Sequence, residues 1–140
     1  MPTGSGTESR SAAILFDTHT LLWLVSEPDQ VSAEARGMIS DPAREVVVSA
    51  VSAWEIAIKT RLGRLAGEPL LAAWPDVVSA MGLTELAIES ADAIMAGRLP
   101  WEHRDPFDRM IVAQAARRGL TIATRDAHIL GAALTPTLRV

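Results

Sequence analysis

Short apolar runs alternate along this chain with longer amphipathic segments, and two of the runs end abruptly at an acid or at a serine. Residues 13–16 form the first run and stop at Asp17, and residues 45–49 contain a β-branched run. Uninterrupted apolar runs of this length are typical of strands buried on both faces of a parallel sheet. We also predict strands over residues 84–87 and 120–124.

The amphipathic segments predict helices between these strands. Residues 105–118 give the clearest one, because Asp105 suits the N-cap, Pro106 the first helical position, and Gly119 follows a basic last turn. Further helices are predicted over residues 19–25, 32–40, 52–62, 70–81 and 89–98. Regular alternation of strand and helix predicts an α/β fold with a mainly parallel sheet between two helical layers.

Composition limits the size and chemistry of the protein. A chain of 140 residues that is 49% apolar and 21% charged is expected to form one globular domain over residues 13–140. Residues 1–12, rich in Gly, Ser and Thr, are expected to be a mobile tail. The absence of cysteine excludes disulfides, thiolate zinc sites and a cysteine nucleophile, so any metal must bind oxygen or imidazole.

Charge and hydropathy bear on partners and location. No run reaches the roughly 18 apolar residues of a membrane span, and we recognise no signal peptide, so a cytoplasmic protein is expected. The formal net charge of −4 argues against nonspecific binding of nucleic acid through a basic surface. It is compatible with a nuclease, because catalytic carboxylates themselves add negative charge that bound cations cancel.

Four acids are expected to meet at one edge of the sheet. Asp17 and Asp126 directly follow predicted strands, and Glu55 lies in the first turn of a helix whose predicted N-cap is Ser52. Parallel strands end at the same edge, and ligands of open α/β sheets bind in the crevice there. Asp108, near the start of the later helix, is the fourth acid of this group.

Ionised carboxylates packed together repel one another strongly enough to require a counter-ion. At separations of about 5 Å each pair costs roughly 3 kcal/mol, whereas a whole domain is stable by only about 5–15 kcal/mol. A divalent cation resolves the conflict, and oxygen ligands suit Mg²⁺ or Mn²⁺. Three of the acids named above also have structural alternatives: Asp105 as a helix cap, Glu55 as a helical partner of Lys59, and Asp126 as a turn residue.

Four motifs of this sequence resemble, in their order, PIN-domain proteins of the VapC toxin type. The matching stretches are residues 15–19, 52–56 with the following 59–65, 103–110 with 113–115, and 124–126. The resemblance implies that Asp17, Glu55, Asp108 and Asp126 are the catalytic and metal-binding acids. It also implies supporting roles for Asp105 and for the hydroxyl of Thr124.

The resemblance further implies a fold and an activity. The fold would be a PIN-like, three-layer α/β/α arrangement with four or five mainly parallel strands. The activity would be that of a Mg²⁺-dependent endoribonuclease, the toxin of a toxin-antitoxin pair, which hydrolyses RNA phosphodiester bonds with a metal-activated water. Expected partners are the RNA substrate, a cognate antitoxin and a second copy of the chain in a homodimer.

Several other residues have two interpretations. Basic side chains near the motifs are candidates for contacts with RNA phosphates or are surface charges: Lys59, Arg61, Arg64, Arg104 and Arg125. Arg109, beside Asp108, is as readily a structural partner. Trp23 and Trp54 are expected in the core rather than under RNA bases. His19 and His103 are candidate ligands or general acids, although an all-carboxylate mechanism requires neither.

Other functions fit the sequence less well. A haloacid-dehalogenase-type phosphatase needs a second Asp two residues after the first, where this chain has His19. A receiver domain needs an adjacent pair of acids after its first strand, and Asp17 stands alone there. A PIN-like module that binds RNA or an antitoxin without cutting remains the alternative of a different class.

Overall fold

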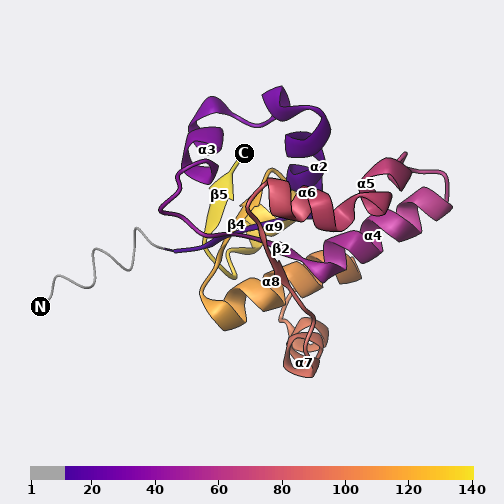
Figure 1. Ribbon diagram of the computed structural model, residues 1–140. Coiled ribbons are helices and arrows are strands. Elements are labelled where there is room, and N and C mark those ends of the chain that lie inside the picture. Colours follow the sequence, from indigo (N-terminus) through magenta and orange to yellow (C-terminus); the bar gives the residue numbers. More distant parts are fainter. Residues whose placement is uncertain (1–11) are drawn as a thin grey trace, which may run out of the picture.

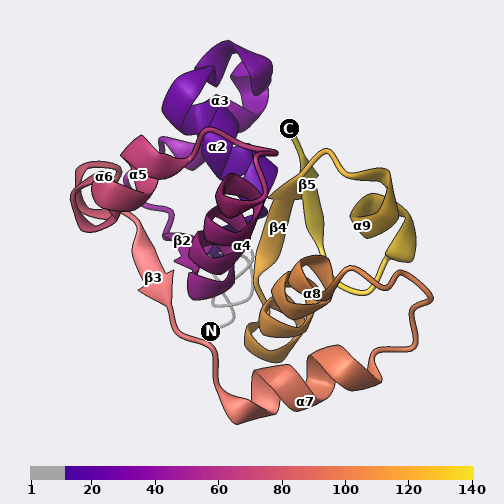
Figure 2. The same ribbon diagram turned by 90° about the vertical axis from the view of Figure 1, so that its right-hand side faces the viewer.

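The sheet has five strands, all of them parallel. The computed structural model describes residues 12–140; residues 1–11, on which most of the predicted tail falls, lie outside the described part. The strand order is β3-β2-β1-β4-β5 (Figures 1 and 2). This confirms the predicted parallel sheet. The strands are β1 (Ile14–Phe16), β2 (Val46–Ser49), β3 (Thr84–Leu86), β4 (Thr121–Thr124) and β5 (Thr137–Arg139).

Helices connect the strands of the described part and cover both faces of the sheet. They are α2 (Thr18–Ser26), a 3-10 turn (Pro28–Gln30), α3 (Ala33–Ile39), α4 (Ala50–Arg61), α5 (Glu68–Ala72), α6 (Trp74–Ala80), α7 (Ser90–Arg98), α8 (Pro106–Arg118) and α9 (Ala127–Ala132). In both views α2 and α3 lie at the end of the molecule opposite α7 (Figures 1 and 2). The predicted α/β/α layering is thus confirmed.

Helix α8 begins and ends as its sequence predicts. The Asp105 side chain accepts hydrogen bonds from the first turn, and Pro106 occupies the first helical position. Gly119 ends the helix in the left-handed conformation, with φ of 66°. A side chain beyond glycine would be strained at that angle, which explains why the helix stops there.

The start of α4 differs from the prediction. Ser49, not Ser52, is its N-cap, because the Ser49 hydroxyl accepts a hydrogen bond from the Val51 N–H. Ser52 lies inside the helix, where its hydroxyl is 2.9 Å from that of Thr18. Glu55 therefore belongs to the second turn rather than the first.

The single helix predicted over residues 70–81 is two short helices, α5 and α6. Pro75 lies in the first turn of α6 and cannot continue a helix from Leu71, since it has no N–H to donate and its ring clashes with the carbonyl four residues earlier. Helix α9 and strand β5 were not predicted; both are short, with six and three residues.

Alternate residues of the central strands feed two separate cores. Ile14 and Phe16 pack into one cluster with α2, α3, α5 and α6, while Leu15 packs into the other with α8 and Ile129 of α9. This period of two is what a strand covered on both faces requires. Among residues 12–140 there is no helix of the length and hydropathy needed to cross a membrane.

Candidate metal and catalytic site

The first two acids emerge side by side from the centre of the sheet. Asp17 follows β1 and Asp126 follows β4, and these strands are neighbours, with Phe16 opposite Ala123. Both acids line a pocket of about 210 Å³, together with His19, Trp23 and Arg125. The sheet edge therefore brings together carboxylates that are more than 100 residues apart in the chain.

Thr124 joins these two acids. Its hydroxyl donates to Asp17 Oδ2 and accepts a hydrogen bond from the Asp126 N–H at 3.0 Å. The other oxygen of Asp17 accepts from the Thr20 N–H at 2.9 Å and so caps α2. These two hydrogen bonds hold the Asp17 side chain and the Asp126 backbone to the same hydroxyl, and a supporting role for Thr124 stays a prediction.

Burial makes the charge on Asp17 costly. Its side chain is almost completely enclosed, and burial raises the pKa of this carboxyl despite hydrogen bonds from Thr124 and Thr20 and the nearby His19. A buried carboxyl with a raised pKa gains from a cation placed against it, because the cation restores the stabilisation that water would have given the charged form.

Asp108 lies in the first turn of α8, close enough to Asp126 to feel its charge. Burial, together with the charges of Asp105 and Asp126, raises the pKa of Asp108 to about 6, while a hydrogen bond from His103 opposes this rise. His103 Nε2 lies 2.7 Å from Asp108 Oδ2. Repulsion among these acids is therefore present in the structure, as the sequence led us to expect.

The donor groups here fit a divalent cation. His103, Asp105 and Asp108 each offer a ligand atom, and these atoms lie within 4.8 Å of one another. Asp105 uses only Oδ1 to cap α8, by accepting from the N–H groups of Phe107 and Asp108 at 2.8 and 3.0 Å. The carboxylate oxygens of Asp105 and Asp108 are suitable ligands for Mg²⁺ or Mn²⁺.

Glu55 lies in an adjoining pocket and not in that of Asp17 and Asp126. This pocket, of about 310 Å³, is lined by Thr18, His19, Lys59 and other residues as well as Glu55. Glu55 is 4% exposed and forms an ion pair with Lys59. His19 lines both pockets, so Glu55 borders the pocket of Asp17 and Asp126 without joining it directly.

The basic residues near the site differ in how firmly they are held. Arg125 stacks on Trp23, with its guanidinium carbon 4.3 Å from the ring centroid, and donates to the carbonyls of Val140 and Gln30. Arg109 is a structural partner, since it donates to carbonyls of Ala96, Gly97, Leu99, Trp101 and His103. Arg61, Arg64 and Arg104 are exposed.

One aromatic residue, Trp54, does not lie where it was predicted, and another, His128, was not identified from the sequence. Trp54 is 52% exposed, so its expected place in the core was wrong; it packs edge-on against Phe107 at 5.1 Å. His128 was missed altogether. Its ring stacks on that of His103 at 4.2 Å, and its Nδ1 is 3.3 Å from Asp126 Oδ1. Recognising Asp126 as the N-cap of α9 would have placed His128 in the turn beside it.

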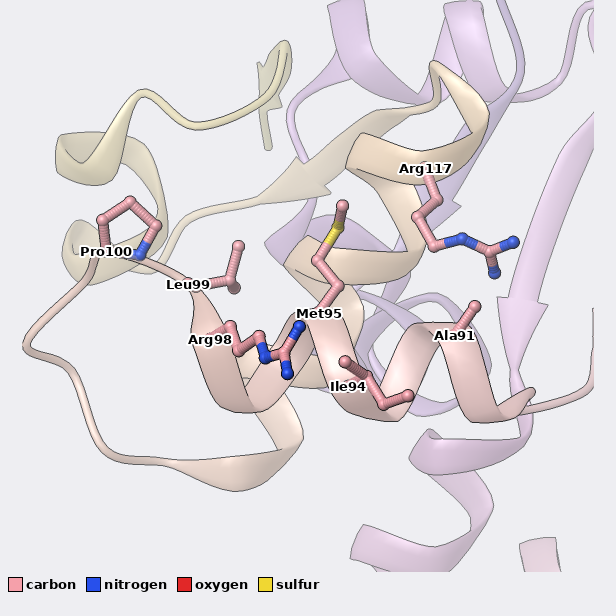
Figure 3. Close-up of a pocket in the computed structure, with 7 residues that line it drawn as sticks. All are labelled: Ala91, Ile94, Met95, Arg98, Leu99, Pro100 and Arg117. Carbon is pink, nitrogen blue, oxygen red and sulfur yellow. The ribbon is translucent and has the colours of Figure 1, made fainter.

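A larger apolar pocket of about 550 Å³ lies along α7 (Figure 3). Its lining includes the apolar side chains of Ile94 and Met95 and the charged side chains of Arg98 and Arg117. Arg117 is in the last turn of α8 and Asp108 in the first, so the helix separates them by about 13 Å. This pocket contains none of the candidate acids and is not the catalytic site.

Comparisons with known proteins agree with the geometry. Residues 14–133 match the PIN domain family. Ribonuclease VapC22 of Mycobacterium tuberculosis is 28% identical over 120 residues, which cover 83% of this chain and 88% of that protein. Ribonuclease VapC16 of the same organism is 39% identical over 59 residues, 41% of this chain and 42% of the relative.

Solved structures share the fold at low sequence identity. VapBC2 from Rickettsia felis, solved with a DNA fragment of its promoter, gives a TM-score of 0.66 at 11% identity and covers 90% of this chain and 97% of its own. VapBC-5 from Mycobacterium tuberculosis, of the VapBC family of toxin-antitoxin systems, gives 0.56 at 23% identity, with 92% and 99% covered. With the family match over most of its length, this chain belongs to the PIN-domain family.

Proposed function

We propose that this protein is a divalent-metal-dependent endoribonuclease, the toxin of a toxin-antitoxin pair. The observation that carries the proposal is that Asp17 and Asp126 line one pocket at the carboxyl edge of β1 and β4 while the charge of Asp126 acts on Asp108, in a chain that belongs to the PIN-domain family. The relatives named as ribonucleases support RNA as the substrate.

The acids have distinct places in this proposal. Asp17, Asp108 and Asp126 would hold Mg²⁺ or Mn²⁺, with Glu55 at the neighbouring pocket and Asp105 offering its free oxygen from the start of α8. The bound ion would supply an activated water for attack on phosphorus and positive charge beside the phosphate. Thr124 would keep Asp17 and the Asp126 backbone at a fixed separation through its two hydrogen bonds.

Basic side chains around the site would meet the RNA backbone. Lys59 and Arg64 line the pocket of Glu55, and Arg61 and Arg104 are exposed. Arg125, which stacks on Trp23, lines the Asp17 pocket and would also contact an RNA phosphate. Positive charge here would offset the net charge of −4 where the RNA binds.

Partners of this chain follow from the same proposal. The structures that share its fold include a member of a toxin-antitoxin family. We infer that a cognate antitoxin covers the acidic edge, that two copies form a homodimer, and that the protein acts in the cytoplasm.

Cleavage of a broad RNA panel by the purified protein, free of antitoxin, tests the activity. We expect cutting with Mg²⁺ or Mn²⁺, none with a chelator, and none by Asp17→Asn protein that is folded. Intact RNA with either metal would instead favour a PIN-like module that binds without cutting.

A further inference from the structure

A further pocket lies beside α9, next to side chains that contact the acids. It has a volume of about 650 Å³, and its lining includes Trp101, Glu102, His103, Arg104 and His128. The segment that joins α7 to α8 forms one wall and α9 the other, and Figure 2 shows this segment looping out beside α9. A pocket of this size accommodates a single nucleotide.

Three rings of this pocket contact one another in series, and one of the two pairs is stacked. Trp101 and His103 are 4.9 Å apart at an angle of 44°, and His103 and His128 are 4.2 Å apart at 14°. The His128 side chain is 65% exposed although His103 covers one face of its ring. The other ring face is therefore open, and open ring faces at the end of a stack bind unpaired bases.

The rings are tied to the acids by short contacts. His103 bonds to Asp108, and His128 Nδ1 lies 3.3 Å from Asp126. Anything stacked on His128 is thus placed one side chain away from the proposed metal ligands. If those acids hold the ion at the cut, a base in this position would belong to a nucleotide next to the phosphate that is cut.

Charged groups of the pocket match a nucleotide rather than a free phosphate. Arg104 is exposed and forms no ion pair with another residue of the described part, so it is available to a phosphate. Glu102 is also exposed and would repel a phosphate, but its oxygens can accept hydrogen bonds from the amino groups of a base. The lining thus offers one group for a phosphate and one for the polar edge of a base.

We infer that this pocket binds one unpaired base of the RNA beside the scissile phosphate, with the base stacked on His128 and its phosphate against Arg104. The inference rests on the proposed ribonuclease function. It restricts the substrate to RNA that is single-stranded at this nucleotide, because a base within a duplex keeps both faces stacked on its neighbours.

Steady-state kinetics on a short RNA with a mapped cut tests the stacking. His128→Ala should raise KM at least about fivefold with little change in kcat, since a stacked base is worth that much in affinity. His128→Phe should restore KM, because the phenyl ring can still stack on the base. Since phenyl lacks the nitrogen near Asp126, this variant also shows that the effect on KM comes from stacking and not from that contact. Ile94→Ala, exposed on α7, is the matched control and should leave both constants unchanged.

An abasic nucleotide identifies which base is bound. When the abasic site replaces the nucleotide whose base occupies the pocket, KM of the unaltered protein should rise by a similar factor. KM of the His128→Ala protein should not rise further, because both changes remove the same contact. Additive effects, or a His128→Phe protein as impaired as His128→Ala, would overturn the inference.

Binding separates this inference from the proposed function. Fluorescence anisotropy of labelled RNA with the Asp17→Asn protein reports the same abasic and His128 effects without any cleavage. If the abasic and His128 effects on binding are present but the unaltered protein never cuts RNA, the nuclease function is refuted and the base-binding pocket is supported. If the protein cuts RNA but these effects are absent, the base-binding pocket is refuted and the nuclease function is supported.

Discussion

Three acids of this site also begin helices. Asp17, Asp105 and Asp126 are the N-caps of α2, α8 and α9, and the Asp17 and Asp105 caps each use only one carboxylate oxygen. The same side chain therefore positions a helix and offers an oxygen at its start. Because asparagine caps helices about as well as aspartate, Asp→Asn changes separate charge from folding.

Asp17→Asn should remove activity while the protein stays folded. We expect cleavage to fall at least about 100-fold, because even residues that only support metal ligands contribute about 10- to 100-fold. The melting temperature should be unchanged or higher, since a buried charge is lost. Parallel thermal melts and cleavage assays check this, and a variant with ordinary activity would contradict the role of Asp17.

Asp108 should make the metal-free protein less stable as pH rises from about 4 to about 6. Its pKa is about 6 in the folded protein and 3.8 in the unfolded chain. Across this window the folded state keeps a proton that the unfolded state has lost, so stability falls by up to about 3 kcal/mol. Denaturant unfolding of Asp108→Asn should lack this decrease, and identical pH profiles would contradict the prediction.

At the scale of elements, strong local signals were sufficient to predict the limits of a helix, whereas long-range contacts could not be predicted from the sequence. Asp105, Pro106 and Gly119 mark α8 so clearly that its limits follow from the sequence. For α4 the predicted cap is Ser52, whereas Ser49 caps the helix. Ser52 instead contacts Thr18, 34 residues away, and no local signal predicts such a contact.

Arg109 should hold the segment between α7 and α8 in place. Its guanidinium donates to several carbonyls there, among them those of Trp101 and His103 at 2.7 and 2.9 Å. Lysine cannot reproduce this fork, so Arg109→Lys should lose about 2 kcal/mol of stability and speed hydrogen exchange in residues 99–104. Arg104→Lys, on the same segment but without such bonds, is the control and should change neither.

Asp92 should fasten α7 to α8. Burial alone would raise its pKa, but hydrogen bonds from Arg118, the Glu89 N–H and Arg117 hold the pKa far below its usual value. Asp92→Asn should destabilise the protein by about 3 kcal/mol, because it leaves two arginines without their buried partner. Chemical denaturation at pH 7 measures this. The loss should shrink as pH falls below about 4, where Asp92 of the unfolded chain is already protonated.

At the scale of the whole molecule, the order of strands decides where the acids meet. The sequence predicts that Asp17 and Asp126 leave one edge of a parallel sheet, and the neighbouring positions of β1 and β4 bring them together. The separate pocket of Glu55 and the stacked pair of His103 and His128 depend on side-chain packing across elements. No local pattern encodes that packing.

Direct titration with Mn²⁺ tests whether the acids form one ion-binding site. Calorimetry at pH 7 should show saturable binding by the unaltered protein, and Asp17→Asn, Asp108→Asn and Asp126→Asn should each weaken it at least about tenfold. Arg139 is exposed and is not among the candidate ligands, so Arg139→Gln is the control and should bind Mn²⁺ as tightly as the unaltered protein does. Equal affinity in all of these proteins would contradict the shared site and, with it, the proposed mechanism.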